Sequence, residues 1–143
     1  MESGAHIRLI LGRAAKAIKN VDRASIADTG LVLSDFTIME ALLHKGPLPI
    51  NTIGEKVLLT SGSMTAAANR LEKRGLIKRI QDSYDARCYN LHLTTSGKKL
   101  IQDAYDKHAQ NLEKIAEILS KSERKELVRM LKKLGHHALQ HRF

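Results

Sequence analysis

The feature that most constrains the fold of this chain is a change in the spacing of its apolar residues at Gly75. Before this glycine, apolar side chains recur every three or four residues, which places them on one face of an α-helix. After it, residues 76–80 and 88–93 read as two strands, with a period of two. The polar residues 82–87 join them as a hairpin loop. The sequence therefore predicts a helix that turns directly into a two-stranded hairpin.

Gly75 also marks how that helix ends. A glycine can adopt the left-handed conformation that closes a helix, and Leu76 just beyond it can pack back on Leu71, as in a Schellman motif. The helix is predicted over residues 61–74, with Ser61 or Ser63 as its N-cap. A short helix from Asn51, its predicted cap, to residue 57 precedes it. Two such helices followed by a hairpin make a winged helix-turn-helix.

Helices are also predicted on both sides of this region. The spacing indicates helices over residues 5–27 and 95–119 and one capped by Ser34, and Ser120 with Glu123 forms a capping box for a helix to residue 140. We expect a mainly α chain with a small β-hairpin. A winged helix-turn-helix over residues 31–95 is flanked by helices in residues 1–30 and 96–143. The apolar stripes of these outer helices exceed what the winged region can cover, which predicts dimerisation.

The net charge and the motifs limit the classes of function that this chain can have. The chain carries 24 Lys and Arg against 15 Asp and Glu, a net charge of +9, which favours an anionic partner. It shows no nucleophile elbow, P-loop, dinucleotide fingerprint or zinc-protease motif, so we expect a non-enzyme without a cofactor. A lone cysteine and the lack of a signal sequence or membrane span predict a cytoplasmic protein.

The helix over residues 61–74 has an outer face suited to DNA. This face is small and polar at its start and basic at its end, so a major groove can admit it. The free N–H groups at residues 61–63 suit a phosphate. Asn69 can read adenine and Arg70 can read guanine through paired hydrogen bonds. The alternative is an ordinary solvated helix face.

The hairpin loop supplies a second contact. Arg87 near its tip can enter a minor groove, where negative potential concentrates. Asp85, two residues earlier, can hold the Arg87 guanidinium in an extended pose. The alternative is a loop ion pair of little energetic value.

These motifs resemble those of the MarR family. Residues 58–65 and 70–79 resemble its recognition helix and first wing strand, while Asp85-Ala86-Arg87 and residues 91–97 resemble its Asp-x-Arg wing motif and the start of the next helix. The similarity spans roughly residues 33–100. It implies a homodimer, held together by the first and the last two helices, whose two winged domains read a palindromic site. Many members carry a basic residue where this chain has Ala66.

We therefore expect a sequence-specific DNA-binding transcription regulator, a ligand-responsive repressor that binds a palindromic operator as a homodimer. The resemblance implies a small aromatic or phenolic effector between the dimer helices and the winged domain, with no residue assigned to it. The alternative is a winged-helix protein–protein interaction module without sequence-specific DNA binding. The predicted partners are double-stranded DNA and a second copy of the chain. The predicted DNA-binding residues are Ser61, Ser63, Thr65, Asn69, Arg70, Lys73, Asp85 and Arg87.

Two further features have competing interpretations. His137 and His141 stand four residues apart, a spacing that can hold a metal on a helix, but no carboxylate or cysteine stands at a matching spacing nearby. We predict no metal there. Cys88 follows Arg87, whose charge can lower a thiol pKa and promote oxidation. The alternative is a plain strand cysteine.

Overall fold

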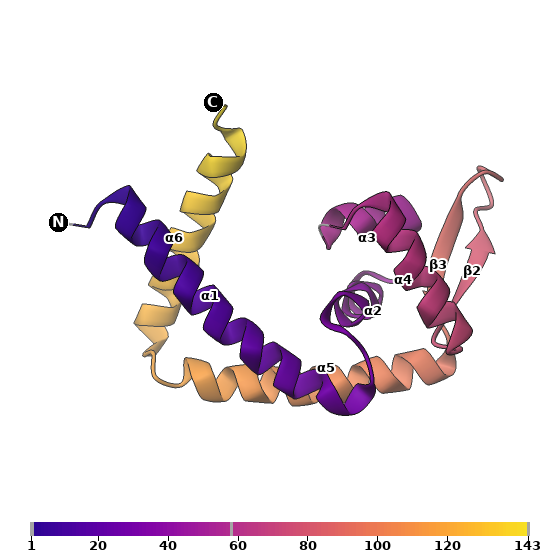
Figure 1. Ribbon diagram of the computed structural model, residues 1–143, viewed down its shortest axis with the longest axis horizontal. Coiled ribbons are helices and arrows are strands. Elements are labelled where there is room, and N and C mark those ends of the chain that lie inside the picture. Colours follow the sequence, from indigo (N-terminus) through magenta and orange to yellow (C-terminus); the bar gives the residue numbers. More distant parts are fainter. Residues whose placement is uncertain (1, 58, 143) are drawn as a thin grey trace. The chain divides into compact units, whose positions relative to one another are not determined.

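The computed structural model describes residues 2–57 and 59–142. Its elements are α1 (Gly4–Ile26), the 3-10 helix η1 (Ala27–Thr29), α2 (Leu33–Lys45), β1 (Leu48–Pro49), α3 (Ile50–Lys56), α4 (Ser61–Lys73), β2 (Ile77–Gln81), β3 (Tyr89–Leu93), α5 (Thr95–Ala116) and α6 (Lys121–Gln140). The chain divides into two compact units after Ala109. The first unit contains the winged helix-turn-helix, with the β2–β3 hairpin directly after α4 (Figure 1). The predicted fold class is confirmed.

The wing belongs to a small antiparallel sheet with the strand order β1-β3-β2. On β3, Leu91 pairs with Arg79 of β2 on one side and with Leu48 of β1 on the other. The sequence did not reveal β1, because a strand of two residues shows no alternation. Pro49 fits there because β1 is an edge strand, where one missing N–H costs little.

The core of the first unit is aliphatic, apart from one phenylalanine. It lies between α2, α3, α4, the sheet and the first half of α5. Its largest fully buried side chains are Phe36, Ile38 and Met39 of α2, Ile53 of α3, Leu71 of α4, Ile77 and Leu91 of the sheet, and Ile101 of α5. Each such side chain contributes roughly 1.5–3 kcal/mol when it leaves water. Helix α4 and the wing therefore pack against the same core.

The end of α4 follows the predicted Schellman motif. Gly75 has a φ of 71°, the left-handed region that a side chain would disfavour. The Leu76 N–H donates to the Leu71 carbonyl at 3.0 Å, and the Gly75 N–H donates to the Glu72 carbonyl at 2.9 Å. Leu71 and Leu76 are both buried in the core. The turn therefore sets where the helix stops and where β2 starts.

Several predicted helix boundaries need correction. The predicted N-caps Ser34, Asn51 and Ser61 or Ser63 are wrong, because α2, α3 and α4 each begin earlier than these residues allow. Thr60 caps α4 instead: its backbone is extended, and its hydroxyl accepts the Ser63 N–H at 3.1 Å. The capping box of Ser120 and Glu123 is confirmed. Helix α5 ends at Ala116, before the predicted residue 119.

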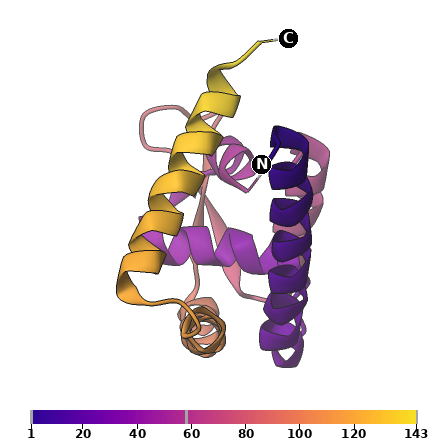
Figure 2. The ribbon, with the colours of Figure 1, turned by 90° about the vertical axis from the view of Figure 1, so that its left-hand side faces the viewer.

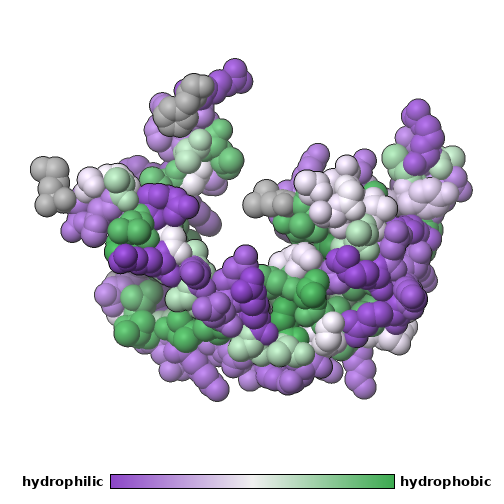
Figure 3. Space-filling model, viewed as in Figure 1, coloured by the Kyte–Doolittle hydropathy of each residue, from purple (hydrophilic) through white to green (hydrophobic). Residues whose placement is uncertain are grey.

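The outer helices expose much of their apolar surface. Helix α1 exposes Ile7, Leu9, Ile10, Leu11 and Ile18, and α6 exposes Leu127, Val128, Met130, Leu131, Leu134 and Leu139. No described residue of α6 is buried. Figure 2 shows both helices as continuous rods, and Figure 3 shows green apolar surface along each of them. Among the described residues, no helix combines the length and apolar character needed to cross a membrane.

The start of α5 is fitted against the turn between α4 and β2. The Thr94 hydroxyl donates to the Gly75 carbonyl at 2.6 Å, and the Thr94 N–H donates to the Leu76 carbonyl at 3.1 Å. Thr94 also caps α5 by accepting the Gly97 N–H at 3.0 Å. A Cβ atom on Gly97 would lie 1.9 Å from the Leu76 oxygen. This position therefore requires glycine for space, since the helix and the turn touch through their backbones.

We expect Gly97→Ala to lower the free energy of unfolding by about 1–3 kcal/mol, because the two backbones must separate to admit a methyl group. Chemical denaturation measures the change. Gly62→Ala is the matched control, because a Cβ atom there meets nothing within 4 Å. Equal stability of the two variants would contradict the close packing of α5 on the turn.

Candidate nucleic-acid interface

Helix α4 has one buried face and one exposed face. Met64, Ala67, Ala68 and Leu71 lie in the core, at spacings of three and four residues. The six predicted DNA-binding residues of this helix are all exposed: Ser61, Ser63, Thr65, Asn69, Arg70 and Lys73. The helix thus presents to solvent the face that the sequence indicated.

Arg70 is held against α2 by Asp35. Its Nη2 and Nε donate to the two carboxylate oxygens at 2.8 and 3.2 Å. The Asp35 side chain is only 8% exposed, whereas that of Arg70 is 51% exposed. The hydrogen bond to Asp35 and its negative charge raise the pKa of Arg70. The paired contact with guanine predicted for Arg70 would require this ion pair to open.

Sequence reasoning missed Asp35, although a signal was present. Asp35 lies on the buried stripe of α2, beside Phe36, Ile38, Met39 and Leu42. A carboxylate on a buried stripe needs a cation or several donors, because burial of an unpaired charge is costly. The sequence could have flagged Asp35 as paired, but it could not say with which cation.

Two more arginines tie α4 to its surroundings. Arg74, at the end of α4, donates to the carbonyls of Thr29 at 3.1 Å and Gly30 at 3.4 Å, which follow α1. Arg79 on β2 donates to Asn69 Oδ1 at 2.7 Å and to Glu72 Oε1 at 3.2 Å. Charge-assisted hydrogen bonds, which are stronger than neutral ones, therefore link α4 to α2, to the turn after α1 and to β2.

The tip of the wing is ordered by Asp82, a second residue that the sequence did not single out. Its Oδ2 accepts the N–H groups of Tyr84 and Asp85 at 3.0 and 2.9 Å, and its Oδ1 accepts Asn90 Nδ2 at 3.0 Å. These three hydrogen bonds, of which that from Asn90 is the largest cause, lower the pKa of Asp82. The carboxylate thus shapes the turn that leads to Asp85.

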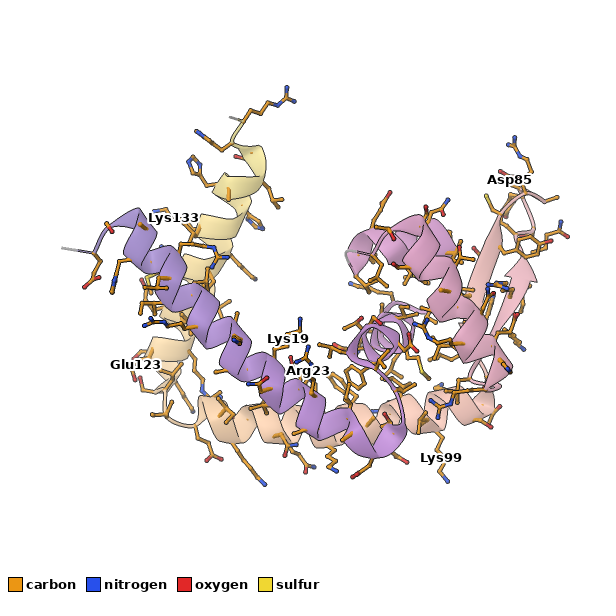
Figure 4. All side chains as sticks on the ribbon, viewed as in Figure 1. Lys19, Arg23, Asp85, Lys99, Glu123 and Lys133 are labelled. Atoms are coloured by element: carbon orange, nitrogen blue, oxygen red, sulfur yellow. The ribbon has the colours of Figure 1, made fainter. Side chains whose placement is uncertain are left out.

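Asp85 pairs with Arg87 through both its oxygens. Its Oδ1 accepts the Arg87 N–H at 3.0 Å and Nε at 3.2 Å, and its Oδ2 accepts Nη2 at 3.4 Å. These bonds from Arg87 lower the pKa of Asp85. The Arg87 side chain remains 91% exposed, and Asp85 lies at the outer end of the hairpin (Figure 4). An exposed pair of this kind adds little stability.

A cleft of about 590 Å³ separates α4 from the wing. Its lining combines residues of β1, α3, α4 and the hairpin: Pro49, Ile50, Asn51, Thr65, Asn69, Arg79, Arg87, Cys88 and Tyr89. The structure therefore brings three predicted residues, Thr65, Asn69 and Arg87, to one cleft. The other five predicted residues, Ser61, Ser63, Arg70, Lys73 and Asp85, do not line it.

The pKa of Cys88 moves in the direction opposite to the expectation from its neighbouring arginine. The thiol donates to Asp85 Oδ2 at 3.5 Å. This hydrogen bond and the Asp85 charge raise the pKa of Cys88, while Arg87 opposes them more weakly. The interpretation in which Arg87 lowers the thiol pKa is therefore wrong, because the hydrogen bond and charge of Asp85 outweigh the charge of Arg87. A raised pKa leaves less reactive thiolate at neutral pH.

We expect Asp85→Asn to speed alkylation of Cys88 by iodoacetamide at pH 7.5, because loss of the carboxylate lowers the thiol pKa. Arg87→Gln should slow it, since the opposing charge is removed. The lone cysteine makes the rate unambiguous, and its pH profile reports the pKa directly. Asp28→Asn, remote in sequence and paired with Lys107, is the control. A pH profile unchanged by Asp85→Asn would contradict the assigned cause.

The C-terminal histidines lie near each other on and just beyond α6. The ring centroids of His137 and His141 are 6.0 Å apart. Within residues 2–57 and 59–142, no group of three or more His, Cys, Asp or Glu side chains is arranged to hold a metal ion.

Known proteins resemble this chain in both sequence and structure. Residues 31–89 match the family model described as the MarR family. The HTH-type transcriptional regulator MhqR of Bacillus subtilis (strain 168) is 32% identical over 139 residues, which cover 97% of this chain and 96% of that protein. A MarR family protein from Bacillus stearothermophilus superposes with a TM-score of 0.80 at 23% identity over 94% of each chain. NadR in complex with 4-hydroxyphenylacetate superposes with a TM-score of 0.78 at 26% identity over 92% of each chain.

Proposed function

We propose, from the membership of this chain in the MarR family, that it is a repressor that binds a palindromic operator as a homodimer. Members of this family are DNA-binding transcription regulators and not enzymes. The observation that carries the proposal is the geometry of the wing. Asp85 aims an Arg87 side chain that is 91% exposed, beside the exposed polar face of α4. A helix and a projecting arginine so arranged suit adjacent major and minor grooves.

In this proposal the residues of the interface have different roles. Ser61 and Ser63 at the start of α4 bind a phosphate, Thr65 and Asn69 face the bases, and Lys73 lies near the DNA backbone. Arg87 enters the minor groove. Arg70 orients α4 through Asp35 instead of reading guanine, because two of its donors are already bound.

The exposed apolar faces of α1 and α6 support the homodimer. Single exposed apolar side chains are common, but rows of them on long helices indicate an interface with another protein surface. In a two-fold dimer the two α4 helices would lie about 34–36 Å apart, one turn of DNA, and read the two halves of a palindrome.

Selection of bound duplexes from a random DNA pool tests the proposal. We expect an enriched palindrome, bound by two chains per site in sedimentation measurements. Weak, salt-sensitive binding with no enriched sequence would instead favour a winged-helix module for protein–protein assembly. The polar and basic face of α4 argues for DNA over that alternative.

Arg87→Ala should weaken binding to the selected operator by several-fold and reduce the slope of log affinity against log salt concentration by about one unit, because one cation leaves the DNA. Fluorescence anisotropy at several salt concentrations measures both quantities. Lys133→Ala on α6 controls for loss of a positive charge outside the winged region. If Arg87→Ala left both quantities unchanged, Arg87 would have no place in the minor groove.

We further propose that a small aromatic or phenolic effector releases the DNA, binding where α1, α2 and α5 meet. At this junction His108 packs edge-on against Phe36, with ring centroids 5.3 Å apart, and its Nε2 lies 3.6 Å from Asp22 Oδ1. Within the part of the chain described, His108 Nδ1 is buried and has no hydrogen-bond partner. A buried polar atom without a partner can bond to a phenolic hydroxyl. The 4-hydroxyphenylacetate bound by NadR is a ligand of this class.

Titration of the operator complex with phenols, hydroquinones and salicylate should weaken binding, because an effector acts by its different affinities for the two protein states. His108→Leu keeps an apolar packing surface and removes the nitrogen, so it should bind the operator yet lose the response. An operator affinity that none of these compounds changes would contradict this class of effector.

A further inference from the structure

We propose that Arg79 fixes the side chain of Asn69 so that Asn69 turns its amide N–H₂ group toward a base, which makes Asn69 prefer guanine over adenine. This inference rests on the proposed operator binding and deepens it. It assigns Arg79, outside the set predicted from sequence, as the positioning residue for one base contact.

The orientation of the Asn69 carboxamide follows from the chemistry of its neighbour. Arg79 Nη2 lies 2.7 Å from Asn69 Oδ1. A guanidinium has five N–H donors and no acceptor, so the atom that faces it must be the carbonyl oxygen. The amide nitrogen, which would repel a second donor, points away from Arg79.

Arg79 is itself firmly placed. Its Nη1 donates to Glu72 Oε1 at 3.2 Å, so one guanidinium binds two side chains that lie one turn apart on α4. Its side chain is only 28% exposed. Its backbone pairs in the sheet with the fully buried Leu91. Because both ends of Arg79 are held, its hydrogen bond keeps the Asn69 oxygen turned toward β2.

This orientation changes what Asn69 can read. An asparagine recognises adenine by accepting from N6 with its oxygen while donating to N7 with its nitrogen. Here one lone pair of the oxygen already accepts from a cation, so the adenine amino group would have to share this acceptor and would approach beside a positive charge. Guanine presents two acceptors, O6 and N7, on the same edge. The amide N–H₂ of Asn69 matches this edge.

The location of Asn69 allows such a contact. Asn69 is exposed, and it lines the cleft between α4 and the wing together with Thr65, one turn earlier on the same face. Glu72 offsets the charge of Arg79, so we assign Arg79 no phosphate contact. Its effect on DNA reaches the base through Asn69.

The test starts from the operator selected with the wild-type chain. Asn69→Ala identifies the base pair that Asn69 reads, as the pair at which preference is lost. Affinities for operators with G·C and A·T at this pair are then compared for wild type, Arg79→Met, Asn69→Ala and the double variant. Lys78→Met is the matched control, because it removes the same charge from the neighbouring position of β2. Thermal unfolding of every variant verifies the fold.

We expect the wild type to prefer guanine at this pair by at least about fivefold, the lower end for one paired contact. Replacing that guanine by 7-deazaguanine should weaken the wild type and leave Asn69→Ala unaffected. Arg79→Met should shift preference toward adenine, because the freed oxygen can then accept from N6. Lys78→Met should leave the preference unchanged, and the double variant should match Asn69→Ala.

Three outcomes would overturn the inference: a wild-type preference for adenine at the Asn69-dependent pair, an Arg79→Met preference equal to that of Lys78→Met, or an Arg79→Met effect that persists without Asn69. Each of these occurs in a protein that still binds its operator sequence-specifically. A wild-type chain that enriches no sequence at all would contradict the proposed function, so the two failures are distinct.

Discussion

The ion pair between Asp35 and Arg70 is the contact on which the presentation of α4 depends. Asp35 is on the buried face of α2, and its carboxylate would be costly to bury without a cation. Arg70 supplies that cation from the exposed side of α4 through two hydrogen bonds, at 2.8 and 3.2 Å. Because both charges must stay together, the two helices cannot rotate independently. Leu71, the residue after Arg70, is fully buried in the core beneath them.

The arginines around α4 fall into two groups, those bound to protein acceptors and one that is exposed. Arg70, Arg74 and Arg79 direct their guanidinium groups onto protein acceptors in α2, in the turn after α1 and on α4 itself. Arg87 instead projects from the wing with its side chain almost fully exposed. A basic residue in a DNA-binding region is therefore not automatically a DNA contact. Here the neighbouring carboxylates decide which arginines hold the fold and which remain available to a ligand.

Two carboxylates give the wing its shape. The carboxylate oxygens of Asp82 and Asp85 accept hydrogen bonds from backbone N–H groups, from Asn90 and from Arg87. These bonds lower the pKa of both carboxyl groups. Groups with lowered pKa values stabilise the folded wing above their ordinary pKa, and this contribution disappears as the pH falls through the lowered values. In the same bonds, N–H donors surround and partly offset the negative charge of the two carboxylates. The tip thus keeps a defined shape.

The sequence alone determined the features that depend on residues a few positions apart. The period of the apolar residues located the helices and the hairpin, Gly75 and Leu76 marked the end of α4, Ser120 and Glu123 capped α6, and Asp85 lay within reach of Arg87. Only the tertiary structure decided the partners of Arg70, Arg74 and Arg79, the strand β1, and the contact of Gly97 with the Leu76 backbone. Arg70 and Asp35 are 35 residues apart, and Arg74 and Thr29 are 45 apart. Local spacing fixes the direction of a side chain on its own helix. The packing of separate elements selects which of many possible acceptors that side chain meets.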